Sequence, residues 1–133
     1  MRAFFKGAGL IAVLAALTLP ASAQFGHPLK GTWSGDWGTS RDRRTHIVLD
    51  LNWDGKAITG TINPGPNAVP IQKASLDANT WMVRLEADGK DASGKSVRYL
   101  VDGKLENIGA YQRVLSGTWT EGGTKGDFRV VRN

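Results

Sequence analysis

The stretch Gly31-Thr32-Trp33-Ser34-Gly35 opens the first segment in which apolar and polar residues alternate, and its beginning recurs near the end of the chain as Gly117-Thr118-Trp119. From Gly31 onward a two-residue alternation dominates the sequence. It is broken by Gly, Pro, Asn and Asp, and no convincing apolar repeat at helical spacing accompanies it. This pattern predicts an all-β domain.

The alternation predicts eight strands, and their short connections favour an antiparallel up-and-down meander. One face of each predicted strand is mostly apolar, as required of a sheet with one buried side. The fourth strand breaks this alternation, so we expect a β-bulge there. Glycines inside the strands permit the bends by which a sheet closes into a barrel. The expected ranges are 30–37, 44–53, 56–62, 70–77, 80–87, 96–105, 112–120 and 125–132.

Closure of an eight-stranded meander places the first strand antiparallel to the last, so Trp33 should neighbour Arg132. Arg132 shares the inward-facing side of its strand with Phe128 and Val130. We expect the stem of Arg132 to lie on the core side and its guanidinium to cover the indole of Trp33. Gly31, Trp33 and Arg132 are therefore the predicted closure residues.

Gly31-x-Trp33 on the first strand, with Arg132 on the last, resembles the short signature of the calycin superfamily, which includes lipocalins, fatty-acid-binding proteins and avidins. The stretches 32–35, 58–61 and 116–119 are more similar to the avidin style of barrel, or to small lipocalin-like domains of bacterial envelope proteins. The resemblance implies a closed eight-stranded barrel over the whole domain.

The N-terminus has the order of a secretory signal peptide. Two basic residues precede the apolar run Leu10–Leu19, and Ala21-Ser22-Ala23 follows it. The run is too short to span a bilayer core of about 30 Å. We expect residues 1–23 to be removed, leaving residues 24–133 as one β-barrel domain that is periplasmic or secreted. The chain has no cysteine, so packing and backbone pairing must stabilise it.

Charge narrows the function classes only slightly. Removing Arg2 and Lys6 lowers the formal net charge from +5 to +3. The one dense basic cluster, Arg41-Asp42-Arg43-Arg44, falls in a predicted loop, where it is either a solvated surface or a site for phosphate or an acidic glycan. Tryptophans and a basic loop could also stack single-stranded nucleic acid, but export argues against that partner.

The chain contains few residues that are suited to catalysis or to metal binding. The chain has two histidines, of which His27 precedes the first strand and His46 shares an outward face with Asp50. Carboxylates such as Asp88 and Asp91 fall in a loop without a desolvating pocket. We therefore predict no catalytic residues, no metal and no cofactor, and a non-enzymatic function.

The predicted connections 38–43, 63–69, 88–95 and 121–124 gather at one end of the barrel, which has the longer predicted connections and is called the looped end below. Binding residues usually sit on loops held by a rigid scaffold, so this end is the expected binding site. Inward-facing Trp37, Tyr99 and Trp119 lie near it, and either fill the core or wall a pocket. At the opposite end, bulky side chains should form a plug, namely Trp33, Trp53, Trp81 and Arg132.

Two functions remain open. The first is binding of one small hydrophobic or aromatic ligand at the looped end by Trp37, Tyr99 and Trp119, with Arg43 and Arg44 beside them. The alternative is an envelope protein-interaction or inhibitor module without an internal ligand. Biotin is not the expected ligand, since avidin-type recognition needs several inward polar groups and this face offers little beyond Tyr99. The oligomeric state is left open.

Overall fold

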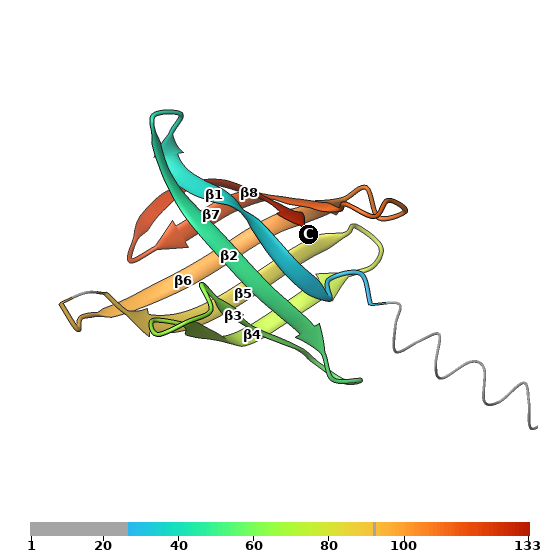
Figure 1. Cartoon of the computed structure of the whole chain (residues 1–133), viewed down its shortest axis with the longest axis horizontal. Coiled ribbons are helices and arrows are strands. Elements are labelled where there is room, and N and C mark those ends of the chain that lie inside the picture. The colour runs from blue at the N-terminus through green and yellow to red at the C-terminus, as the bar shows by residue number, and fades with distance from the viewer. Residues whose placement is uncertain (1–26, 92) are drawn as a thin grey trace, which may run out of the picture.

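The computed structural model describes residues 27–91 and 93–133, so the predicted signal peptide lies outside the described residues (Figure 1). Consecutive strands pair antiparallel, and the first pairs with the last, which gives the predicted closed up-and-down barrel. The strands are β1 (Gly31–Ser40), β2 (Arg43–Trp53), β3 (Ile58–Ile62), β4 (Val69–Asp77), β5 (Met82–Lys90), β6 (Ser96–Glu106), β7 (Val114–Glu121) and β8 (Thr124–Arg132).

The strands are longer at the looped end than the sequence predicted. The turns between β1 and β2 and between β7 and β8 shrink to residues 41–42 and 122–123, and the longest connection, residues 107–113, lies at the opposite end. That end also carries residues 27–30, and we call it the N-terminal end (Figure 1). The expectation that the looped end has the longer connections was therefore wrong for these two turns.

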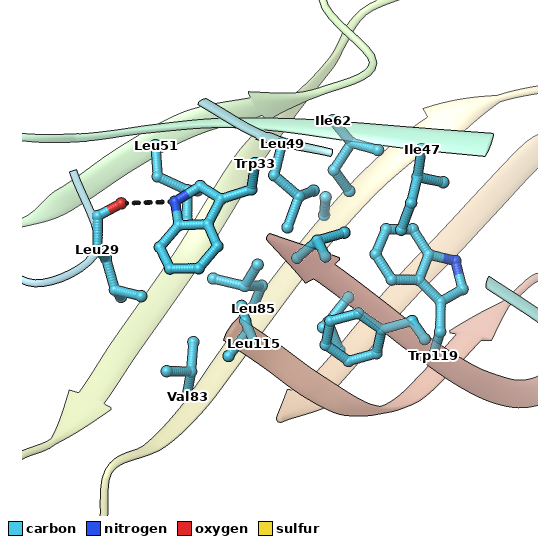
Figure 2. Packing of buried hydrophobic residues seen from close by; sticks show 14 of the residues in the cluster. Leu29, Trp33, Ile47, Leu49, Leu51, Ile62, Val83, Leu85, Leu115 and Trp119 are labelled. Atoms are coloured by element: carbon cyan, nitrogen blue, oxygen red, sulfur yellow. Dashed lines mark hydrogen bonds between the residues drawn. The ribbon is translucent and has the colours of Figure 1, made fainter. Parts of the chain in front are cut away.

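Alternation fills the barrel with apolar side chains. Inward-facing residues of β2, β5, β7 and β8 are almost completely buried, together with Trp33 and Trp119, neither of which is exposed at all. Figure 2 shows Leu29 and Trp33 packed on one side of this core and Ile47 and Trp119 on the other. An eight-stranded barrel is just wide enough for such filling.

The predicted bulge in β4 is present. The register with β5 shifts between Ile71 and Lys73, so the inward face changes from Val69 and Ile71 to Ala74 and Leu76. An extra residue on one strand bends that strand and increases its twist. The bulge thus redirects the second half of β4.

The pairing of β3 with β4 is the shortest in the barrel. It consists of two residue pairs near the looped end, Thr61 with Pro70 and Ile62 with Val69, and Pro70 has no backbone N–H to donate. Toward the N-terminal end the two strands are not paired with each other, although β3 stays paired with β2 and β4 with β5. We call this opening in the barrel wall the β3–β4 gap.

Residues 27–30 close the N-terminal end of the barrel. Leu29 is fully buried, and its carbonyl oxygen accepts a 2.9 Å hydrogen bond from the indole Nε1 of Trp33 (Figure 2). The guanidinium of Arg113 donates to the carbonyl oxygen of Pro28 at 2.8 Å. His27 stacks on Trp53, with ring centroids 4.6 Å apart. This short segment therefore contacts β1, β2 and the connection between β6 and β7.

Arg132 pairs with Trp33 in the register, as predicted, but its guanidinium does not cover the indole. It lies 5.9 Å from the ring centroid of Tyr111 and donates to the carbonyl oxygens of Tyr111 and Lys30. Its stem lies against Gly31, where a Cβ would be 2.9 Å from the Arg132 Cδ. The expected cation–π contact with Trp33 was wrong, because residues 27–30 bring Leu29 to that indole instead.

Candidate functional site

The structure brings together the three aromatic residues predicted at the looped end. The ring of Trp119 is stacked with that of Trp37 at 6.2 Å and meets Tyr99 edge-on at 6.4 Å, and Phe128 packs against it at 5.6 Å. Trp119 donates its indole N–H to Glu121. Burial, with the nearby carboxylates, raises the pKa of Tyr99. With Trp119 fully enclosed, ligand contact at this cluster would fall on the half-buried Trp37 and Tyr99.

The two arginines predicted for the looped end differ in their surroundings. Arg44 lies on the outer face of the barrel, where its guanidinium binds Asp36 and Asp127, both at 2.8 Å. These carboxylates raise the pKa of Arg44, and Arg44 in turn lowers the pKa of Asp127. Arg44 therefore links β1, β2 and β8.

Arg43 and Trp37 line a hollow of about 260 Å³ that Arg44 also borders.

A larger pocket lies at the N-terminal end, beside the β3–β4 gap. It has a volume of about 520 Å³ and is open on one side. Trp53 and Ile58 approach it from the β2–β3 side, and Leu76 and Trp81 from the β4–β5 side. The remaining lining residues are His27, Pro28, Lys56, Ala57, Ala74, Ser75 and Ala78. We call this the gap pocket.

Apolar side chains dominate the gap pocket. Trp53, Ile58, Leu76 and Trp81 are all half-buried and pack against the core, so the pocket borders the core of the barrel. The plug expected from Trp53 and Trp81 is therefore absent, because these two rings line an open pocket. The unpaired length of β3 and β4 leaves them without a covering strand.

Trp81 lines the gap pocket with an unusual backbone. Its φ angle is +62°, in the left-handed region that side chains other than glycine rarely adopt. Two backbone hydrogen bonds hold it there: its N–H donates to Asp77 at 2.6 Å, and its carbonyl oxygen accepts from Leu105 at 2.8 Å. Such a conformation costs about 1–3 kcal/mol, and residues of this kind cluster at functional sites.

His27 forms another part of the wall. Its ring stacks on Trp53, and its Nδ1 accepts a hydrogen bond from the backbone N–H of Leu29 at 3.2 Å. Partial burial lowers the pKa of His27 below its ordinary value. The stacked, partly buried position beside Trp53 therefore favours the uncharged imidazole, whose Nδ1 can accept the hydrogen bond from Leu29.

Lys56 is the one charged side chain among the residues that line the gap pocket. Two carboxylates lie nearby in the sequence but are engaged in their own turns. Asp54 accepts from the backbone N–H groups of Lys56 and Ala57, which lowers its pKa, and Asp77 accepts from that of Asn79. The pocket therefore offers an apolar floor and a positive charge.

No group of three or more His, Asp or Glu residues within 27–91 and 93–133 is placed to hold a metal ion. His46 lies on the exposed face of β2. The same residues contain no helix long and apolar enough to cross a membrane.

Comparison of the chain with protein-family models, curated proteins and solved structures finds no match. The structure shows an eight-stranded closed barrel, and the relation to calycins stays a prediction from the short sequence signature.

Trp53 and Trp81 lie at the end of the barrel predicted from the sequence, but their place in a pocket was not predicted. Two signals in the sequence point toward the gap: the broken alternation of the fourth strand, and Pro70 at its start. The backbone of Trp81 and the stacking of His27 have no signal of their own. The stacking of His27 on Trp53 and the bond between Leu105 and Trp81 join segments far apart in the chain.

Proposed function

We propose that this chain is an exported, non-enzymatic barrel that binds one small apolar or aromatic ligand, and that the gap pocket receives it. The observation that carries the proposal is the pocket of about 520 Å³ with two half-exposed tryptophans in its wall. Pockets for small ligands measure roughly 300–1,000 Å³ and are lined mainly by hydrophobic and aromatic side chains. With few polar groups, such a site favours loose selectivity.

The looped end is the second candidate position for the same activity. Trp37 is half-buried there and borders the hollow of about 260 Å³ with Arg43. Binding at this end remains a prediction, and the hollow beside Trp37 is lined mostly by polar and charged residues. The gap pocket is therefore the better supported of the two positions.

A titration with the neutral fluorescent dye N-phenylnaphthylamine separates the two positions. In Ala74→Phe the added ring fills the gap pocket from β4, and in Trp81→Ala one wall is lost. We expect each to weaken dye binding about tenfold or more, whereas Trp37→Ala at the looped end should leave it unchanged. The opposite pattern would move the ligand to the looped end. No dye binding by the native chain would overturn the proposed function.

Native mass spectrometry of the protein purified from its own cells identifies what is bound. A small apolar adduct that Ala74→Phe no longer retains supports the proposal. A co-purifying protein that Ala74→Phe still retains would favour the envelope protein-interaction or inhibitor module instead.

A further inference from the structure

The β3–β4 gap leaves backbone hydrogen-bonding groups without a strand partner. From Lys73 to Asp77, β4 is paired with β5 on one side, and no strand within residues 27–91 and 93–133 pairs with its other side. In an antiparallel pair, residues that bond to the neighbouring strand alternate with residues whose N–H and C=O point away from it. Part of the backbone of β4 therefore points into the gap, in the manner of an edge strand.

The gap pocket lies directly along this edge. Ala74, Ser75 and Leu76 line it from β4, and Ile58 from the first residue of β3. A ligand in the pocket therefore meets two kinds of surface: apolar and aromatic side chains, and a row of backbone donors and acceptors. An extended peptide matches both, because its backbone adds a strand to a free edge while alternate side chains enter a pocket.

The charges around the pocket select among peptides. Lys56 is the one charged side chain among the residues that line the pocket, and the carboxylates of Asp54 and Asp77 are not among these residues. An acidic residue placed beside Lys56 would face a positive charge, and a basic residue there would face repulsion.

We infer that the ligand of the gap pocket is an extended, acidic polypeptide segment that pairs as a strand with the free edge of β4 and places an apolar or aromatic side chain against Trp53 and Trp81. The inference rests on the proposed function, since it keeps the same pocket and the same apolar contact, but the apolar or aromatic group that enters the pocket is then a side chain of a polypeptide. It makes the barrel a receptor for a chain terminus or an unfolded segment of another protein.

The test uses a capped five-residue peptide with the alternation Thr-Phe-Thr-Leu-Asp, followed by calorimetry and hydrogen exchange. A matched peptide carries N-methyl groups on alternate amides, which keeps the side chains and removes strand pairing. We expect the N-methylated peptide to bind at least about tenfold more weakly than the unmodified peptide, because it loses two or more hydrogen bonds. Backbone amides of β4 between Lys73 and Asp77 should become protected when the unmodified peptide binds.

Charge supplies a second arm of the test. Lys56→Glu should weaken binding of the acidic peptide and strengthen binding of a variant peptide that ends in Lys. The matched control is Lys95→Glu at the looped end. The carboxylate of Asp91 accepts hydrogen bonds from the backbone N–H groups of Ser93 and Lys95, just as that of Asp54 accepts from Lys56 and Ala57. This control should change neither affinity.

The outcomes separate the two proposals. If N-phenylnaphthylamine binds the gap pocket and the peptide does not, the proposed function stands and the peptide inference is overturned. Equal affinity for the N-methylated and unmodified peptides would also overturn it, since strand pairing would then contribute nothing. Failure of both dye and peptide would overturn both proposals.

Discussion

Trp33 is held by its burial, by a side-chain hydrogen bond and by backbone pairing on both sides. It is fully buried, its indole N–H is bonded to the carbonyl oxygen of Leu29, and its backbone pairs with both Leu49 and Arg132. A side chain with these contacts should contribute strongly to the free energy of unfolding.

We predict that Trp33→Ala lowers the free energy of unfolding by about 3–5 kcal/mol, since it removes a large buried side chain and leaves a cavity. Trp33→Phe keeps most of the apolar volume and should cost less. Urea unfolding followed by circular dichroism measures both. A loss below about 1 kcal/mol for Trp33→Ala would show that the N-terminal end is not held by this residue.

His27 should make stability depend on pH. Partial burial against Trp53 lowers its pKa, so the unfolded chain takes up a proton at a higher pH than the folded chain does. The contribution is therefore fully present above the unfolded pKa of about 6.5 and is lost as the pH falls toward the lower folded value. Protonation also removes the Nδ1 acceptor for the Leu29 N–H.

Unfolding curves between pH 8 and pH 5 check this prediction. We expect His27→Asn, which retains a side-chain acceptor but does not titrate, to flatten the decrease in stability near pH 6. His46→Asn is the matched control, because His46 lies on the exposed face of β2 and should leave the decrease in place. A decrease that persists in His27→Asn and vanishes in His46→Asn would contradict the assignment.

The position of a single residue was predictable from the sequence only where that residue lies in a strand with alternating apolar and polar residues. The alternation gave the pairing of Trp33 with Arg132, because register follows from parity once the barrel closes. The position of the Arg132 guanidinium depends on Tyr111 in a long connection and on residues 27–30 before the first strand. Neither segment has a periodicity from which its path could be inferred.

At the scale of the strands, two glycines face each other where β6 and β7 bend. Gly103 pairs with Gly117, and a Cβ on Gly117 would collide with the backbone carbonyl group of Asp102. A Cβ on Gly103 would lie 2.9 Å from the ring of Phe128. The strands approach closely here because neither residue has a side chain.

We predict that Gly117→Ala lowers the free energy of unfolding by about 1–3 kcal/mol, because the strands must separate to admit the methyl group. Gly109→Ala provides the control: nothing lies within 4 Å of a Cβ at that position, and the effect should stay within about 0.5 kcal/mol. Thermal or urea unfolding of both variants decides the matter. Equal effects would show that the close approach of β6 and β7 is not needed.

The eight strands and the bulge of β4 were predictable because both appear in the local pattern of apolar residues. The β3–β4 gap was not. Whether two neighbouring strands stay paired along their whole length depends on how the bulge redirects β4 and on which segments pack beneath it. These are contacts between distant parts of the chain, and the broken alternation and Pro70 are only local signs of them.

At the scale of the whole molecule, the barrel has two unequal ends. The looped end is occupied by packed aromatic rings around Trp119 and by the ion pairs of Arg44. The N-terminal end is sealed over Trp33 by residues 27–30 but stays open beside the gap. The sequence predicted a closed barrel with a binding end, and the structure favours the other end for the pocket.

The most direct test of the central claim is a map of backbone amide chemical shifts during titration of the protein with N-phenylnaphthylamine. We predict that the changes gather at His27, at residues 53–58 and at residues 74–81, which line the gap pocket. Changes gathered at residues 37–45 and around Tyr99 would contradict this account, because they would place the ligand at the looped end.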